Sequence, residues 1–403
     1  MVRMVKTKKP ELMCPIRDLA SLEACKDYAD AVYFGVADFS LRANANAIRE
    51  ENMGQFVAKC HSYKIKAYLT VNAVVYEGEL KALDRLMKKT KTAKVDAVIV
   101  WDPAAIRLAK KYGLKIFIST QANVSNTETV EFYKKLGAKR VVLAREMNLE
   151  QIKAVRKKTK IEIETFVHGA MCMAISGRCI LSSYLYGTSA NCGFCAQPCR
   201  KEWVLSDPEG NQLVTEGKYF LSAKDLCMVE FIPELVKAGI DSFKIEGRRR
   251  DPRYIEVTSR CYREAIDSYF SGTFSKEKVV QWRKDLESVY NRGYSTGFYF
   301  SVPGKEGISY EKADNASVHK KKLVGYVTKY YPKIQVAEIN LNHAGINQGD
   351  EFIVEGAETY WRGQVATLQI NRENIKHGKK GERVAIKVEK IVRAKDKVFI
   401  LTL

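Results

Sequence analysis

The 403-residue sequence lacks several features that define large classes of proteins. No apolar run approaches the ~20 residues that a membrane-spanning helix needs. The basic start, MVRMVKTKKPELMCP, has no apolar core of the kind found in secretory signals. We therefore expect a cytoplasmic protein without a membrane segment. Only five histidines are present and none forms an H-E-x-x-H pattern, which argues against a zinc protease of that class.

Acidic residues are also under-represented. The chain has 67 Lys and Arg against 47 Asp and Glu, a formal charge of +20. Such an excess favours polyanionic partners, and nucleic acid is the commonest large polyanion in a cytosol. Solubility alone explains the charge equally well. Hydrophobic residues make up 46% and charged residues 28%, a balance typical of globular proteins.

Short β-branched or aromatic runs alternate with amphipathic helical stretches along the first 250 residues. Alternating strands and helices imply parallel pairing, and eight units predict a TIM-like (β/α)₈ barrel, with an open doubly wound sheet as the alternative. No G-x-G-x-x-G follows a first strand, which disfavours a dinucleotide-binding variant. The predicted strands are 11–15, 31–35, 66–72, 97–102, 115–121, 140–146, 161–168 and 242–248. Helices are predicted at 17–28, 50–63, 78–90, 103–112, 126–136, 148–158, 228–239, 252–270 and 275–290.

The spacing of these elements predicts the domain organisation. The barrel takes residues 1–300, and an unusually long connection after the seventh strand, 170–227, lies on the side where barrels carry catalytic loops. A linker is predicted at 301–318. Residues 319–403 read as a small all-β barrel domain with 16 basic and 9 acidic residues. This domain is expected either to contact an RNA backbone or to act as an adaptor or dimerisation unit.

Polar residues fall at the carboxyl ends of most predicted strands, where the catalytic face of a barrel forms. We take His168, Glu246, Lys244, Asn72 and Gln121 as candidate catalytic residues, with structural partners as the alternative role. Asp102, Arg145 and Glu146 occupy similar strand-end positions. Arg248, Arg249 and Arg250 follow the eighth strand and, with Arg42, are candidates for RNA phosphate contacts; a solvated turn is the alternative.

Ten cysteines are present, and five lie within 28 residues at the spacing C-x₆-C-x₁₂-C-x₂-C-x₃-C. They are Cys172, Cys179, Cys192, Cys195 and Cys199, and Cys227 follows. Four thiolates suit either tetrahedral zinc or an iron–sulfur cluster. Zinc ribbons usually have two C-x₂-C pairs, whereas this chain has one, so the spacing favours a cluster and leaves zinc open. Some of these thiols could instead be nucleophiles or inert buried residues.

Several long segments resemble the peptidase U32 family, named from a collagenase-like protease. They include FVHGAMCMAISGRCILSSYLYG and NCGFCAQPCRKEW within 166–203, SAKDLCM (222–228) and IDSFKIEGRRRDPRYI (240–255). The resemblance extends over nearly the whole chain and is greatest to the branch implicated in tRNA hydroxylation. It implies a [4Fe–4S] cluster held by Cys172, Cys179, Cys195 and Cys227, with Cys199 as the alternative ligand.

The resemblance also implies an activity and partners. The expected reaction is hydroxylation of C5 of the wobble uridine in a tRNA anticodon loop, in a process that depends on prephenate or a factor derived from it. A homo-oligomer or a hetero-oligomer with a paralogue is a further expectation. Two other functions stay open: a collagenase-like peptidase with a cysteine nucleophile paired with His168, and a zinc-stabilised, non-catalytic RNA-binding protein.

Overall fold

A computed structural model describes residues 8–36, 39–41, 48–212, 217–310 and 315–402. Its first part is a closed barrel of eight parallel strands, in which β9 pairs with both β7 and β1. The predicted TIM-like barrel and all eight of its strands are confirmed. The strands are β1 Glu11–Pro15, β2 Ala31–Phe34, β3 Lys66–Val71, β4 Ala97–Val100, β5 Ile116–Ile118, β6 Ala138–Val142, β7 Glu162–Gly169 and β9 Ser242–Ile245.

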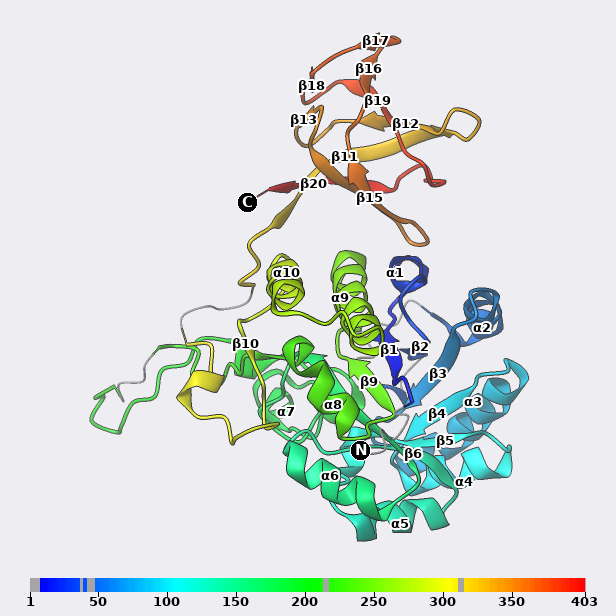
Figure 1. Ribbon diagram of the computed structural model, residues 1–403, viewed down its shortest axis with the longest axis vertical. Coiled ribbons are helices and arrows are strands. Elements are labelled where there is room, and N and C mark those ends of the chain that lie inside the picture. The colour runs from blue at the N-terminus through cyan, green and yellow to red at the C-terminus, as the bar shows by residue number, and fades with distance from the viewer. Residues whose placement is uncertain (1–7, 37–38, 42–47, 213–216, 311–314, 403) are drawn as a thin grey trace.

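Helices surround this barrel (Figure 1). Their boundaries follow local signals: α4, for example, begins after Asp102, whose side chain accepts the Ala104 N–H, and has Pro103 in its first turn. The helices run at α1 Leu19–Cys25, α2 Met53–Ser62, α3 Leu80–Thr92, α4 Pro103–Lys111, α5 Thr127–Lys135, α6 Leu149–Lys158, α8 Ile232–Lys237, α9 Pro252–Phe270 and α10 Lys276–Glu287. Among the described residues, no helix combines the length and apolar character that crossing a membrane requires.

The long connection after β7 carries a short helix, α7 (Leu181–Tyr186), and ends in β8 (Asp225–Cys227). Strand β8 runs antiparallel to β7 and parallel to β10 (Tyr294–Ser295), so two short strands extend the sheet beyond the barrel. The sequence did not predict either strand because each has only two or three residues. Part of the predicted linker also packs here: the Lys224 N–H donates to the Gly307 carbonyl (2.8 Å).

The barrel interior contains a buried ionic network. Arg140, on β6, bonds Glu11 (2.7 Å) and Glu164 (3.0 Å), and Lys244 bonds the other oxygen of Glu164 (3.0 Å). The Arg140 guanidinium also lies over the Phe117 ring. Because these charges are paired with good geometry, the barrel tolerates them in its interior.

The C-terminal part is all-β and antiparallel, as predicted. Its main sheet has eight strands in the order β15-β14-β20-β11-β12-β19-β16-β17 around a separate apolar core. The strands are β11 Lys320–Tyr331, β12 Val336–Asn340, β13 Ile346–Asn347, β14 Glu351–Glu355, β15 Tyr360–Gln364, β16 Leu368–Ile370, β17 Glu373–Asn374, β18 His377–Gly378, β19 Arg383–Lys387 and β20 Lys397–Thr402.

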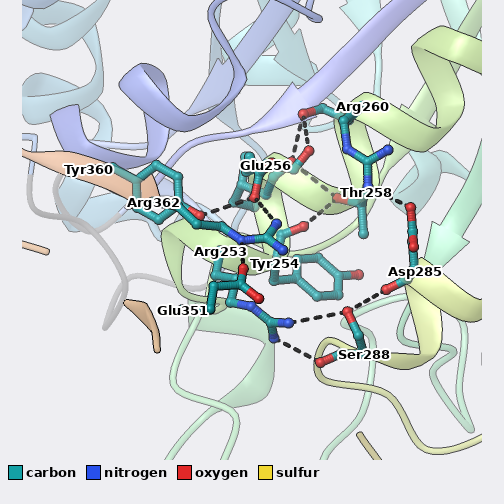
Figure 2. A network of polar contacts seen from close by, with 12 residues as sticks. Arg253, Tyr254, Glu256, Thr258, Arg260, Asp285, Ser288, Glu351, Tyr360 and Arg362 are labelled. Carbon is teal, nitrogen blue, oxygen red and sulfur yellow. Dashed lines mark hydrogen bonds and ion pairs between the residues drawn. The ribbon is translucent and has the colours of Figure 1, made fainter. Parts of the chain in front are cut away.

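Polar contacts join this domain to helix α9. Glu256 accepts hydrogen bonds from the Tyr360 hydroxyl (3.1 Å) and the Arg362 guanidinium (3.2 Å) (Figure 2). Lys321 forms ion pairs with Asp251 at the start of α9 (2.7 Å) and with Glu355 of its own domain. The domain therefore packs on the outer helices, next to α9, α10 and α1 (Figure 1), rather than on the carboxyl ends of the barrel strands.

Candidate active site at the carboxyl ends of the barrel strands

A cavity of about 100 Å³ lies at the carboxyl ends of the barrel strands; we call it the strand-end cavity. It brings together strand-end residues that the sequence predicted and cysteines from the insertion. Its lining includes Tyr33, Asn72, Gln121, Arg145, Phe166, Lys244, Glu246, Cys172, Cys195 and Cys199. Tyr33 and Glu246, which are 213 positions apart in the sequence, thus line one space at the face where barrel enzymes bind substrates.

Asn72 and Gln121 form a buried amide network. The Asn72 amide donates to Gln121 Oε1 (3.1 Å) and to Ser119 Oγ (3.2 Å). The Gln121 amide in turn donates to the Ser176 carbonyl in the insertion (3.0 Å). These side chains therefore attach the insertion to the barrel, and much of their hydrogen-bonding capacity is already used.

Lys244 lies at the floor of the cavity. Its ammonium group bonds Glu164 and lies 4.4 Å from the centre of the Tyr33 ring. Burial lowers the pKa of Lys244, and the Glu164 carboxylate opposes that effect. With one bond to Glu164, the ammonium group retains donor capacity toward the cavity.

The predicted RNA-contacting arginines have different surroundings. Arg248 is buried and donates to Ser40 Oγ (2.7 Å) and Thr70 Oγ1 (2.9 Å), so it forms part of the cavity wall. Arg249 is exposed and donates to the Cys195 carbonyl (3.2 Å), while Arg250 lies over the Tyr290 ring. Arg42 lies outside the described residues. A phosphate contact stays a prediction for this group, and Arg249 is the member best exposed for it.

His168 does not line the cavity. Strand periodicity would place it on the same face as Phe166, but the pairing of β7 with β9 shifts register between these two residues. The ring instead lies among Tyr254, Tyr262 and Tyr294 and has no solvent exposure. Burial lowers its pKa to about 3. The position expected to be a catalytic histidine is thus a neutral residue in an aromatic cluster.

The insertion gathers four of its cysteines. Cys172, Cys195 and Cys199 line the cavity. Burial raises the pKa of Cys199, the Arg200 guanidinium opposes that effect, and the nearby thiols of Cys172, Cys195 and Cys179 raise it further. The other three thiols thus lie close enough to Cys199 to act on its charge.

Cys227 lies elsewhere. It is buried in β8 opposite His168, with the Tyr262 hydroxyl 3.9 Å from its sulfur, and it does not line the cavity. Cys192 contacts the exposed Tyr76 hydroxyl (3.7 Å). The structure therefore favours Cys199, the alternative ligand, over Cys227 as the fourth member of the set.

Four neighbouring thiols are a donor set that both zinc and iron–sulfur clusters use. Within the described ranges, no three His, Cys, Asp or Glu side chains are grouped so that they could hold one metal ion. Zinc needs its sulfurs within about 2.3 Å of one centre. A cluster accepts thiolates that are farther apart, because its own iron and sulfide ions lie between them.

Two guanidinium groups lie close to these thiols. Arg145 and Arg200 both interact electrostatically with Cys172, and such cations offset thiolate charge. Arg200 is buried and donates to the Met171 and Ala223 carbonyls. Sequence analysis did not single out Arg200, because it lies in a short turn, Pro198–Arg200, without strand or longer helix periodicity.

Comparison with known proteins places this geometry among relatives. The model of the family "Peptidase family U32" matches residues 18–309. The chain is 44% identical to an uncharacterized protease of Methanocaldococcus jannaschii, over 97% of this chain and 98% of that protein. It is 35% identical to a collagenase of Porphyromonas gingivalis, over 96% and 97%. It is 34% identical to tRNA hydroxylation protein P1 of Bacillus subtilis, over 87% and 85%.

Proposed function

Because this chain belongs to peptidase family U32, we propose that it is a tRNA-modifying enzyme that hydroxylates C5 of the wobble uridine. The observation that carries the proposal is the gathering of Cys172, Cys195 and Cys199 around the strand-end cavity, with Cys179 near enough to Cys199 to act on its charge. Similarity to a tRNA hydroxylation protein over most of both chains supports the same class of reaction. The charge of +20 suits an RNA substrate.

In this proposal the four cysteines hold a [4Fe–4S] cluster. With four thiolate ligands such a group is closed, and when bound it would pass electrons. Converting C5–H to C5–OH oxidises the base by two electrons, so an oxygen donor from outside the chain has to deliver the oxygen atom and accept those electrons. Arg145 and Arg200 offset the negative charge of the thiolates. The Asn72–Gln121 network keeps the insertion, and with it the cysteines, in register with the strand ends.

The chain's own residues would orient the base. A wobble uridine lies in a single-stranded loop and can turn out of its stack into a pocket. Uracil offers two carbonyl acceptors and one N–H donor. In the strand-end cavity the Lys244 ammonium group would donate to a uracil carbonyl, and the Glu246 carboxylate would accept from the uracil N–H. The rings of Tyr33 and Phe166 would lie beside the uracil ring.

The collagenase-like alternative has less support from the site. A cysteine peptidase needs a thiolate beside an imidazolium, open to a polypeptide. Cys227 and His168 face one another, but burial raises the pKa of the thiol and lowers that of the imidazole. Both groups are therefore neutral and inaccessible.

The proposal is tested by whether the protein introduces 5-hydroxyuridine into the tRNA of a foreign host. The gene is expressed in a strain without 5-hydroxyuridine in its tRNA, and nucleosides are analysed by mass spectrometry. We expect the modification with the wild type and with Cys192→Ser, but not with Cys199→Ser. A parallel strain unable to make prephenate should lack the modification. No 5-hydroxyuridine with any variant, together with gelatin hydrolysis by the purified protein, would reject the hydroxylase in favour of the peptidase.

A further inference from the structure

The end of the barrel opposite the strand-end cavity is strongly basic. Five connections there run from the end of a helix to the start of the next strand, and we call them together the basic end. With 15 lysines, no arginine and two carboxylates, they have a charge of +13 out of the +20 of the whole chain. Because the strands are parallel and paired, their first residues lie at one end of the barrel. The five segments are 61–66, 88–96, 110–115, 134–139 and 157–162.

Helix ends explain only some of these lysines. A cation in the last turn of a helix offsets the helix dipole, and several of the lysines have that position. Each connection also has an exposed lysine beyond its helix: Lys64, Lys94, Lys115, Lys139 and Lys160. One such lysine before every one of five successive strands is a pattern that helix stability does not require.

The two carboxylates of the basic end already have partners. Glu162 accepts from Arg140 Nε (2.9 Å), and Asp96 bonds the His61 ring (2.8 Å) and accepts the Ala67 N–H (2.8 Å). The lysines therefore lack a matching set of counter-charges within these segments. Repulsion among so many like charges disfavours the folded state, and a polyanionic ligand would relieve it.

Two of the lysines occupy positions that favour glycine. Lys64 and Lys94 lie two residues beyond the ends of α2 and α3, with φ of 61° and 57°. Gly113 and Gly137 hold the same position after α4 and α5, at 61° and 102°. Glycine adopts this left-handed conformation without strain, whereas a residue with a Cβ does not. A lysine at such a position is unfavourable for folding, which indicates that its charge has a use.

The basic end is also concave. An open hollow of about 550 Å³ lies between the connections that precede β5 and β6, and Lys110, Lys115 and Lys139 line it. Its floor is low at Gly137, where a Cβ would meet no atom within 4 Å. Three ammonium groups around a hollow of this kind suit the phosphates of a polynucleotide backbone.

We propose that the basic end binds the phosphate backbone of double-stranded RNA without reading its sequence. Lysine pairs with phosphate as a flexible point charge, whereas base edges are read mainly by arginine and amide side chains. A lipid surface fits less well, because of the large hydrophobic side chains exposed in the described ranges only Leu136 lies in the basic end.

The choice of RNA among polyanions rests on the proposed function, but the site goes beyond it. The two ends of the barrel face in opposite directions. The duplex is therefore a different segment of RNA from the nucleotide in the strand-end cavity.

Binding of a blunt RNA duplex of about 16 base pairs to the full chain tests this surface, by fluorescence anisotropy at several salt concentrations. The first variant replaces the five lysines that precede the strands by glutamine: Lys64, Lys94, Lys115, Lys139 and Lys160. The matched control replaces five exposed lysines of α10 and the β domain by glutamine: Lys276, Lys284, Lys333, Lys387 and Lys390. A second variant combines Lys64→Gly with Lys94→Gly, which removes charge where the backbone favours glycine and so preserves the fold.

We expect the first variant to bind the duplex about a hundredfold more weakly at about 0.1 M salt. The slope of log K against log salt concentration should be smaller by about three to four, since each lost phosphate contact removes about 0.9. The second variant should reduce the slope by about one to two, and the control should lose less than about threefold in affinity.

No binding of the duplex to the wild type, an unchanged salt slope in both variants, or an equal loss in the control would overturn the proposal. Binding of polyglutamate, or of vesicles of phosphatidylglycerol and phosphatidylcholine, as tightly as the duplex would also overturn it. The duplex has no anticodon loop and the assay needs no turnover, so failure of the hydroxylase proposal would leave this result intact.

Discussion

At the residue scale, burial decides what the titratable groups at this site do. Sequence position predicted His168 as a catalytic residue because it ends a barrel strand. The structure turns it away from the strand-end cavity and surrounds it with three tyrosines. The Tyr262 hydroxyl does not depend on it, since that group donates to the Val167 carbonyl (2.7 Å) and accepts the Met228 N–H (2.9 Å).

This burial predicts a pH-dependent stability. The pKa of His168 is about 3 in the folded protein and about 6.5 when unfolded, so between these values the unfolded state binds more protons. The free energy of unfolding should therefore fall as pH drops below about 6.5, by about 2 kcal/mol at pH 5 from this group alone. His168→Phe should remove that part of the pH dependence, as measured by urea unfolding at several pH values. If the unfolding free energy of His168→Phe changed with pH as steeply as that of the wild type, the His168 ring would bind a proton as readily in the folded protein as in the unfolded one, which would contradict this prediction.

At the scale of elements, the insertion after β7 makes this barrel unusual. The sequence correctly placed every barrel strand and the position of the insertion, because periodicity and connection length are local properties. It did not determine which cysteines meet. Spacing and resemblance put Cys227 in the ligand set, whereas β8 pairs with β7 and carries Cys227 to the other side of the sheet, beside His168.

The cysteine assignment predicts a contrast between two conservative variants. Cys199→Ser should lose most of the bound iron and sulfide, because serine is a poor cluster ligand and Cys199 lines the strand-end cavity. Cys227→Ser should keep both, since Cys227 is buried away from the cavity. Iron and sulfide are assayed after purification without oxygen, with Cys192→Ser as the control. The reverse pattern would restore Cys227 as the ligand.

At the scale of the whole molecule, two domains are joined by polar contacts and by apolar packing, since Ile353 and Tyr360 of the β domain are buried against the barrel's core. The sequence predicted an all-β domain from its short strands and its turns, and that is what the structure contains. Its position next to α9 depends on groups far apart in the chain: Glu256 receives bonds from Tyr360 and Arg362 (Figure 2). Because the Tyr360 hydroxyl is buried against this carboxylate, the contact is sensitive to loss of the acceptor.

Glu256→Ala should therefore destabilise the protein by about 1–3 kcal/mol, because it leaves the Tyr360 hydroxyl without its acceptor and removes one partner of Arg362. Thermal and urea unfolding would measure the change. Glu358→Ala breaks the exposed Arg393–Glu358 pair within the β domain and should change stability by less than about 0.5 kcal/mol. Equal effects of the two variants would contradict a stabilising role for the α9 contact.

The sequence by itself determined the alternation of strands and helices, the parallel pairing that follows from it, the site of the insertion and the all-β character of the last 85 residues. Each follows from the periodicity and composition of short segments. Closure of the barrel was preferred over an open sheet and is shown by the pairing of β9 with both β7 and β1. Only the tertiary structure decided that a register shift turns His168 away from the strand-end cavity, and that Cys199 lines this cavity while Cys227 does not. These outcomes depend on strand pairing and loop packing between distant residues, and no local pattern specifies them.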